Sequence, residues 1–206
     1  MSDFDARAKT WDDDPDKIAR SRALAAAIRD RVELRSSTRL FEYGAGTGQL
    51  ALALAPHVAT VMLADASAGM IAVARERLGA AGLDPDRAIQ LDLLTDPAPD
   101  EEFDLVVSAM TLHHVPDIPA LLTALHGLLA SGGTIALSDL DAEDGSFHSH
   151  DHDFTGHNGF DRAALGTQAR AAGFTDIAFS TPLEVTKEVD GVARAFPLFL
   201  LTARRG

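Results

Sequence analysis

The sequence predicts an α/β fold in which a mostly parallel sheet ends in an antiparallel hairpin, and three observations support this. Short β-type runs alternate with helical segments along most of the chain, as in strands joined by crossover helices. Residues 103–109 are almost wholly apolar, as expected for a parallel strand that is buried on both faces. Near the end, Asp190-Gly191 separates two strand-like runs, which is a strong hairpin signal.

The first predicted element is an N-terminal helical segment. Asp14-Pro15 suits the cap and first turn of a helix. Leu24, Ile28 and Val32 then recur at helical spacing, so they are expected to share one buried face.

The remaining elements follow from apolar runs and from the residues that bound them. Strands are expected at 38–43, 60–64, 88–91, 103–109, 134–137, 177–189 and 192–203. Helices are expected at 49–55, 67–78, 117–130 and 161–172. Their predicted ends are Pro56, Gly79 with Gly82, Ser131-Gly132-Gly133 and Gly173, and Ser67 and Asp161 are predicted N-caps. A long loop is expected over 139–160.

The composition restricts the class of protein. The chain has 206 residues, enough for one domain, with 46% hydrophobic and 24% charged residues. It has no cysteine, which excludes disulfides, thiolate metal sites and a cysteine nucleophile. The 31 acidic residues outnumber the 18 Lys and Arg, for a net charge of −13, so nucleic acids and anionic membranes are not expected partners.

Targeting signals are also not expected. Residues 1–9 carry charged side chains instead of the apolar core of a secretion signal. No apolar run reaches the roughly 18 residues that a membrane-spanning helix needs. We therefore expect a cytoplasmic protein without a membrane partner, either a monomer or a homodimer.

A glycine-rich turn follows the first predicted strand, in the order Gly44-Ala45-Gly46-Thr47-Gly48. Such a turn lets backbone approach a ligand, with the positive N-terminus of the next helix pointing at it. Its spacing differs from the Gly-x-Gly-x-x-Gly of dinucleotide-binding folds, and it lacks the lysine of a phosphate-binding loop. On its own, the turn is weak evidence, because a tight chain reversal also explains such a pattern.

Two acidic residues strengthen the binding interpretation. Asp65 closes the second predicted strand, where a carboxylate can accept both hydroxyls of a ribose. Asp92 closes the third, where it can accept from an adenine amino group. Both fall at the strand edge where open parallel sheets bind ligands.

These segments resemble the class I S-adenosylmethionine-dependent methyltransferases, in their small-molecule branch. The matching pieces are LFEYGAGTG (40–48), LADASAGM (63–70), FDLVVS (103–108) with LHHVPD (112–117), and LLASGGT (128–134). The likeness covers 38–139 closely, and a terminal antiparallel hairpin is usual in the family. It implies a Rossmann-like three-layer α/β/α sandwich with a seven-stranded sheet. It also implies one methyltransferase domain over 1–206, with a helical cap (1–36), a cofactor-binding core (37–139) and a substrate loop, helix and hairpin (140–206).

The resemblance also implies a set of cofactor contacts. The glycine loop, including Gly44, Ala45 and Gly46, approaches the methionine part of S-adenosyl-L-methionine, and Glu42 supports it. Asp65 takes the ribose hydroxyls. The adenine lies near Ala66, Met70, Asp92 and Leu93, and the Ser108 carbonyl faces the amino group of the cofactor. Trp11 is the candidate lid from the N-terminal segment, although an anchoring role in the core explains it equally well.

Histidines are the candidate catalytic residues. Methyl transfer from a sulfonium needs alignment above all, but an amine or phenol acceptor must also lose a proton, and His is the usual base near neutral pH. His113 is the leading candidate, with His114 beside it and Asp139 as the orienting carboxylate. The alternative is that the two histidines only pack their loop. His126, off the apolar stripe of its helix, is expected to be solvated.

The loop over 139–161 holds seven acidic residues and no Lys or Arg. A pocket lined by it should favour a neutral or cationic small-molecule acceptor. His150, His157 and Asn158 are the candidate substrate contacts. Loop residues His148, His150, Asp151, His152, Asp153 and His157 are possible metal ligands, but a polar lid explains them more simply, and no metal is expected.

Three functions remain open from sequence. The first is O-, N- or C-methylation of a small molecule, which leaves S-adenosyl-L-homocysteine. The second is a non-catalytic S-adenosylmethionine-binding regulatory or partner protein. The third, a nicotinamide oxidoreductase, is disfavoured by the glycine spacing and by the absence of a Tyr-x-x-x-Lys pair.

Overall fold

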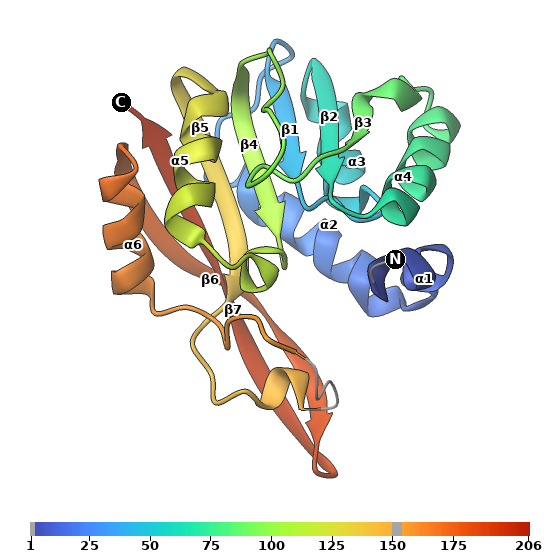
Figure 1. The fold of residues 1–206 in the computed structure, drawn as a ribbon, viewed down its shortest axis with the longest axis vertical. Helices are drawn as coiled ribbons and strands as arrows, with labels where there is room; N and C mark the ends of the chain where they lie inside the picture. The colour runs from blue at the N-terminus through green and yellow to red at the C-terminus, as the bar shows by residue number, and fades with distance from the viewer. Residues whose placement is uncertain (1–2, 150–153) are drawn as a thin grey trace.

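The computed structural model describes residues 3–149 and 154–206, which form one seven-stranded mixed sheet with helices on both faces (Figure 1). The strand order is β3-β2-β1-β4-β5-β7-β6. All neighbours pair in parallel except β7, which is antiparallel to both β5 and β6. The strands are β1 (Arg39–Tyr43), β2 (Thr60–Asp65), β3 (Ala88–Gln90), β4 (Phe103–Ala109), β5 (Leu129–Leu140), β6 (Phe174–Val189) and β7 (Val192–Arg205). The predicted α/β class, strand number and antiparallel ending are confirmed.

The helices form two layers, because strand side chains alternate between the faces of the sheet. On β1, Leu40 packs with α2 (Pro15–Arg29), α3 (Gln49–Leu54) and α4 (Ala68–Ala80). The next residue, Phe41, packs on the opposite face with α5 (Ile118–Leu128) and α6 (Arg162–Ala171). The result is the expected three-layer sandwich, with α1 (Asp3–Arg7) and a 3-10 helix (Ala8–Asp13) preceding α2.

Side chains cap four helices and explain where these helices begin. Asp14 accepts from the amide of Asp16 at 3.0 Å, and Ser67 from that of Met70 at 3.2 Å. Asp117 and Asp161 accept in the same way from amides three residues onward, at 2.9 and 2.8 Å. Each cap satisfies a backbone N–H that has no partner inside its helix.

The fifth strand departs from its predicted bounds at both ends. Helix α5 ends at Leu128, and β5 begins at once with Leu129, which pairs with Phe103. The glycines at 132 and 133 therefore lie within the strand, where a register shift between Phe103 and Leu105 and the φ of +73° at Gly132 accommodate them. Residues 130–133 have no register partner on β4 or β7 and form a bulge, so the predicted turn is kept inside the strand, which resumes pairing at Thr134 and continues to Leu140.

Smaller differences follow from packing. Val32 lies beyond the end of α2, yet it still packs against the core that contains Leu24 and Ile28, as predicted. His126 is partly buried instead of solvated, because its ring meets the edge of Phe174, at 5.0 Å between centroids. Strand β3 ends at Gln90, which leaves Asp92 two residues beyond it.

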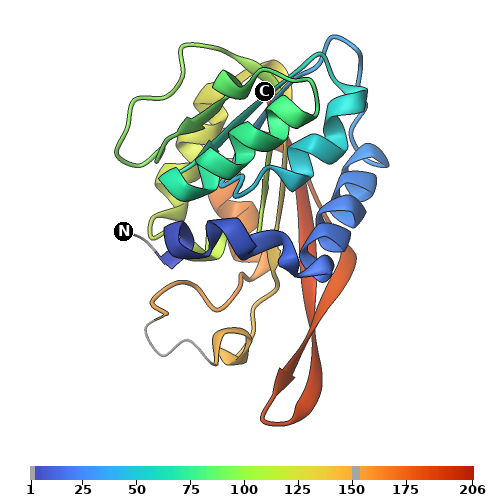
Figure 2. The ribbon, with the colours of Figure 1, turned by 90° about the vertical axis from the view of Figure 1, so that its right-hand side faces the viewer.

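The terminal hairpin projects beyond the sheet (Figures 1 and 2). Its turn has Asp190 at φ +51° and Gly191 at φ +77°, the left-handed pair that a two-residue hairpin requires. Leu140, Phe147, Phe196 and Leu198 form a small separate core between the base of the hairpin and the loop that follows β5. Within the described parts of the chain, no helix has the length and apolar character needed to cross a bilayer.

Candidate functional site

The glycine turn lies at the carboxyl end of β1, and its backbone geometry explains the glycines. Gly44 has φ +66°, and a Cβ atom there would lie 2.2 Å from Cγ2 of Thr111. Gly48 has φ +82°, and its Cβ would lie 2.5 Å from Leu63. The Thr111 hydroxyl donates to the Gly44 carbonyl at 3.1 Å, and the Ala45 amide donates to Ala64 at 2.9 Å. The turn is therefore fixed against both β2 and the segment after β4.

Gly46 differs from the other two, because the space above it is open. It has φ +54°, and only Nε1 of Trp11 lies within 4 Å of the position that a Cβ would take. Its amide donates to Oδ2 of Asp65 at 2.8 Å, while Oδ1 of Asp65 accepts from the Ser67 amide at 2.8 Å. Burial raises the pKa of Asp65, and the two amide hydrogen bonds oppose that rise. Gly46 and Asp65 are thus held side by side at one rim.

Glu42 lies beneath this turn and is 3% exposed. Its Oε2 accepts from the Ala51 amide of α3 at 2.9 Å. Burial is the main cause that raises the pKa of Glu42 to about 8, with the negative charge of Asp65 adding to the rise. The carboxyl joins the glycine turn to the helix that follows it.

The residues expected around an adenine lie at the ends of β2 and β3. Ala66 is exposed, whereas Met70 and Leu93 are buried. Oδ1 of Asp92 accepts from the Leu94 amide at 3.0 Å and from the Tyr43 hydroxyl at 3.4 Å. Tyr43 was not among the predicted site residues, although it is the only tyrosine in the chain.

Ser108 lies at the centre of the same edge, on β4, and is buried. Its hydroxyl donates to the carbonyl of Tyr43 at 2.7 Å, which ties the end of β4 to the end of β1. The side chain therefore serves the fold, and only the backbone of Ser108 remains for the predicted contact.

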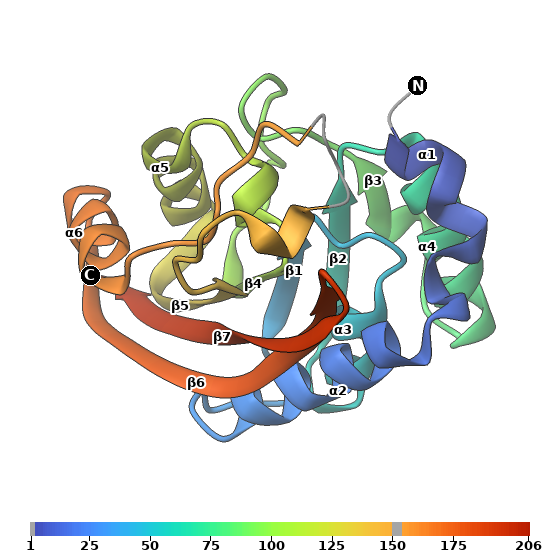
Figure 3. The ribbon, with the colours of Figure 1, turned by 90° about the horizontal axis from the view of Figure 1, so that it is seen from below.

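The N-terminal segment runs beside α4 at this end of the sheet, as Figures 2 and 3 show. Asp5 accepts from the Ser67 hydroxyl at 2.6 Å and from the Gly69 amide at 2.9 Å. Asp12 accepts from the Thr47 hydroxyl at 3.0 Å and forms an ion pair with Arg77. Sequence reasoning missed both aspartates because their partners lie 35 or more residues away.

Trp11 lies within this segment and is half-buried. Its ring lies beneath Nζ of Lys17 at 3.7 Å and beside the ring of Phe4 at 5.7 Å between centroids. The indole thus has an anchoring environment and also overhangs Gly46, so the structure is compatible with both predicted roles.

His113 and Asp139 meet in the interior, beside the same edge. Nδ1 of His113 lies 2.7 Å from Oδ1 of Asp139, and the two residues are 2% and 0% exposed. Asp139 also accepts from the amides of His113 at 3.3 Å and Leu140 at 2.7 Å. Because Asp139 engages Nδ1, Nε2 is the ring nitrogen left for chemistry.

The other candidate residues of the two loops differ in their exposure and in their distance from His113. His114 is exposed beside His113, with 4.1 Å between ring centroids. Nε2 of His157 lies 2.9 Å from the Val115 carbonyl and so joins the two loops, and Asn158 is exposed. His150 lies outside the described residues, as do Asp151, His152 and Asp153. His148, predicted only as a possible metal ligand, lies close to His113.

The acidic residues of this loop that the structure describes are engaged in ion pairs or hydrogen bonds within the fold. Asp141 forms an ion pair with Arg162 at 2.6 Å, and Asp144 pairs with Arg194 at 2.9 Å. Glu143 accepts from the Phe147 amide at 3.1 Å. Asp139 and Asp161 are engaged as described above. Each described carboxylate of the loop therefore has a partner that neutralises it or fixes it in the fold.

Two positive groups lie near His148 and Asp139 in the described part of the chain. Arg20, on α2, is half-buried, and no described carboxylate lies within ion-pair distance of it. Burial lowers the pKa of Arg20, while the negative charges of Asp14 and Asp139 raise it. Nζ of Lys187, on β6, donates to the Phe147 carbonyl at 2.5 Å. Burial lowers the pKa of Lys187, and the positive charge of Arg20 lowers it further. Sequence reasoning found neither cation.

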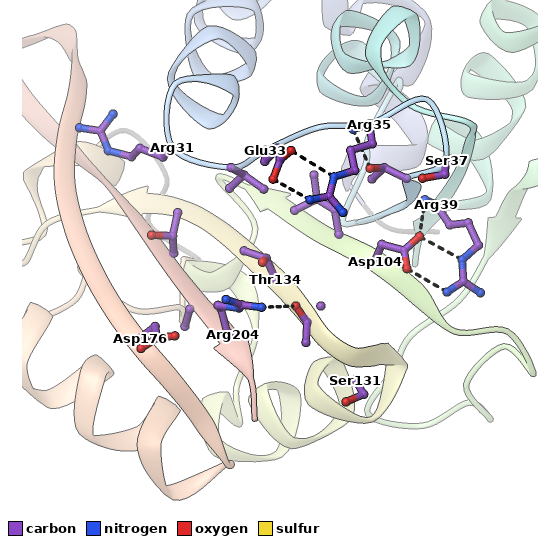
Figure 4. Close-up of a pocket in the computed structure, with 17 residues that line it drawn as sticks. Arg31, Glu33, Arg35, Ser37, Arg39, Asp104, Ser131, Thr134, Asp176 and Arg204 are labelled. Atoms are coloured by element: carbon purple, nitrogen blue, oxygen red, sulfur yellow. Dashed lines mark hydrogen bonds and ion pairs between the residues drawn. The ribbon is translucent and has the colours of Figure 1, made fainter.

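A broad hollow lies at the opposite edge of the sheet, away from all of these residues (Figure 4). It is lined by Arg31, Arg35, Arg39 and Arg204, among others. Arg35 and Arg39 are already paired with Glu33 and Asp104. The hollow lies at the amino ends of the parallel strands, where open α/β sheets do not usually bind ligands.

A family model and several curated proteins have similar sequences. The family model described as "Methyltransferase domain" matches residues 15–178. An uncharacterized methyltransferase of Mycobacterium tuberculosis is 36% identical over 111 residues, covering 54% of this chain and 55% of that protein. A demethylmenaquinone methyltransferase of Thermus thermophilus is 33% identical over 120 residues, covering 57% and 52%. The chain thus matches about half the length of these curated relatives.

Solved structures share the fold. The YcgJ protein of Bacillus subtilis aligns with a TM-score of 0.72 at 19% identity, over 89% of this chain and 97% of that chain. Haemonchus contortus phosphoethanolamine N-methyltransferase 2, in complex with S-adenosyl-L-methionine, aligns with a TM-score of 0.71 at 18% identity, over 88% and 52%.

Proposed function

The chain belongs to the methyltransferase domain family, and we propose that it transfers the methyl group of S-adenosyl-L-methionine to a small-molecule acceptor. The acceptor atom is an oxygen, nitrogen or carbon, and the product is S-adenosyl-L-homocysteine. The sulfonium supplies an activated methyl group and a neutral leaving thioether. The chain must therefore bind the cofactor, align the acceptor behind the methyl group and accept a proton where one is released.

One observation carries this proposal: the Gly46 amide and the Asp65 carboxylate are joined at a rim that is open above Gly46. An ionised carboxylate has about four lone-pair positions, and the amides of Gly46 and Ser67 use two of them. The other two suit the vicinal hydroxyls of a ribose. The same rim lies at the carboxyl ends of the parallel strands, where this class of sheet binds nucleosides.

The other cofactor contacts follow from position along this rim. We assign the backbone of Gly44, Ala45 and Gly46 to the methionine part and the Ser108 carbonyl to its amino group. Ala66, Met70, Asp92 and Leu93 provide the adenine site. Trp11 lies over Gly46 and would close the site from above. Glu42 has no direct contact in this assignment and instead holds the turn through Ala51.

His113 and Asp139 are the proposed proton-handling pair. Asp139 holds Nδ1 at 2.7 Å, which orients the ring and leaves the Nε2 lone pair to accept a proton from the acceptor. Arg20 and Lys187 favour an acceptor that carries negative charge or develops it on deprotonation. This proposal differs from the neutral or cationic acceptor expected from the sequence, because Asp141 and Asp144, two of the carboxylates behind that expectation, pair with arginines.

Cofactor binding tests the proposal without knowledge of the acceptor. Titration calorimetry with S-adenosyl-L-homocysteine should show one site, and Asp65→Ala should weaken binding by at least about tenfold, because a charge-assisted hydrogen bond contributes roughly 1.5–3 kcal/mol. Glu76→Gln, which changes an exposed acid of α4, should leave binding unchanged. Equal affinity in Asp65→Ala and the parent would remove the ribose assignment.

Turnover is tested separately. The protein is incubated with methyl-labelled S-adenosyl-L-methionine and a low-molecular-mass metabolite fraction, and labelled products are identified by mass spectrometry. A methylated small molecule supports the proposal. Tight binding of S-adenosyl-L-homocysteine with no labelled product would favour the non-catalytic binding protein instead.

A further inference from the structure

Three imidazoles from two separate segments converge beside the proposed acceptor site. His113 and His114 belong to the 3-10 helix Leu112–His114, and His148 ends the 3-10 helix Ser146–His148. Their ring centroids are 4.1, 5.1 and 5.9 Å apart. One nitrogen from each ring lies within 4.8 Å of one from each of the others. The sequence separation of about 35 residues hides this cluster from motif reading.

The spacing of the rings matches that around a tetrahedral metal ion. Zinc–nitrogen bonds of about 2.0–2.1 Å and tetrahedral angles place ligand nitrogens about 3.4 Å apart, and the centroids of the imidazoles about 5 Å apart. The three observed centroid distances lie on both sides of that value. The nitrogens lie within 4.8 Å of one another, against about 3.4 Å around a zinc ion, so the set would close by side-chain movements of about 1 Å.

The surroundings of the cluster are those of a metal site. His113 engages Asp139 through Nδ1, the carboxylate–histidine contact that orients a metal-bound imidazole and directs Nε2 at the ion. The His148 ring is stacked on Phe154 at 3.7 Å, and Phe147 and Phe4 lie against His113 and His114. Such an apolar wall limits water access to a bound ion.

The backbone that carries the ligands is also fixed. The His157 amide donates to the His113 carbonyl at 2.8 Å, and Glu143 caps the turn that carries His148 through the Phe147 amide at 3.1 Å. The Glu143 amide also donates to the Asn158 carbonyl at 2.9 Å, so residues 157 and 158 link the two segments through contacts other than the imidazoles.

We propose that His113, His114 and His148 bind a divalent transition-metal ion. Imidazole sets of this kind suit zinc, nickel, copper and iron(II), and three protein ligands leave the fourth position for water or for an oxygen of a substrate. The metal site does not depend on the proposed methyl transfer, but the role given to the ion below rests on that proposed function. A bound ion would occupy Nε2 of His113 and lower the pKa of a coordinated hydroxyl, in place of proton transfer to the imidazole.

Metal titration of the full chain tests the site. Protein freed of metal by a chelator is titrated with Zn²⁺ in a calorimeter and with Co²⁺ in a spectrophotometer. One ion per chain should bind, with the visible absorption of tetrahedral Co²⁺. His148→Ala and His114→Ala should each weaken binding by at least about tenfold, and Asp139→Asn by about 10–100-fold. His57→Gln is the matched control and should bind like the parent.

Two results would overturn the metal site. One is the absence of saturable binding of either ion, and the other is undiminished binding in both His148→Ala and His114→Ala. A double change of His150 and His152 should leave one ion bound, and loss of binding there alone would also contradict the assignment. Binding of S-adenosyl-L-homocysteine is measured on the same samples, so failure of the metal site is distinguished from failure of the cofactor site.

Discussion

The buried carboxyl of Glu42 makes the stability of the fold depend on pH in a way that can be calculated. Its pKa is about 8 in the folded chain, against an ordinary value of 4.5. Between these values the side chain is ionised in the unfolded chain and protonated in the folded chain. The folded state then binds the extra proton, so this group lowers the free energy of unfolding as the pH rises from 4.5 through 8.

The size of the effect follows from the linkage relation. Each pH unit inside this window changes the free energy of unfolding by about 1.36 kcal/mol, so raising the pH from 5 to 7 costs about 2.5 kcal/mol at this one group. Glu42→Gln cannot ionise, yet its amide oxygen can still accept from the Ala51 amide. The variant should therefore gain about 2.5 kcal/mol relative to the parent between pH 5 and 7.

Urea unfolding at pH 5, 6 and 7 measures this difference directly. Other titrating groups affect the parent and Glu42→Gln alike and cancel in the comparison. Glu76→Gln, at an exposed position of α4, should run parallel to the parent. If Glu42→Gln also runs parallel to the parent, the carboxyl beneath the glycine turn is not held neutral, and the reasoning from its burial fails.

Three further predictions concern the site. Gly44→Ala should lower the free energy of unfolding by about 1–3 kcal/mol, because the new Cβ would lie 2.2 Å from Thr111. Adding Thr111→Gly should restore part of this loss, as measured by urea unfolding. If the effects of the two changes are simply additive, there is no such clash. His113→Asn should reduce turnover on the acceptor identified by labelling by about 10²–10⁴-fold while the affinity for S-adenosyl-L-homocysteine stays the same; unchanged turnover would exclude His113. Asp12→Asn should weaken the ion pair to Arg77 and loosen the N-terminal segment. Trypsin should then cleave faster at Lys9, and S-adenosyl-L-homocysteine should dissociate faster in stopped-flow measurements. Rates equal to those of the parent would show that this ion pair does not hold the N-terminal segment in place.

The parts of the molecule that follow from local chemistry were predictable from sequence. Asp14, Ser67 and Asp161 could be assigned as caps because a cap depends on residues only two or three positions away. His113 and Asp139 could be paired because parallel topology brings the ends of neighbouring strands to one edge, and β4 and β5 are neighbours in the sheet.

The contacts that sequence reasoning missed depend on the path of the chain in space. Asp5 and Asp12 reach α4 and the glycine turn only because the N-terminal segment folds back along α4. His148 joins His113 through the course of an irregular loop that no periodicity describes. The loop acids were counted correctly, but composition does not reveal that Arg162 and Arg194 pair with two of them.

A crystal structure of the protein with S-adenosyl-L-homocysteine is the most direct test of the proposed cofactor site. We expect both ribose hydroxyls to lie within hydrogen-bond distance of the Asp65 carboxylate, with the homocysteine part along Gly44 and Gly46. The thioether sulfur should face the side where His113 lies. A ligand seated instead in the hollow between Arg31 and Arg204, or a rim that stays empty at saturating ligand, would contradict this placement.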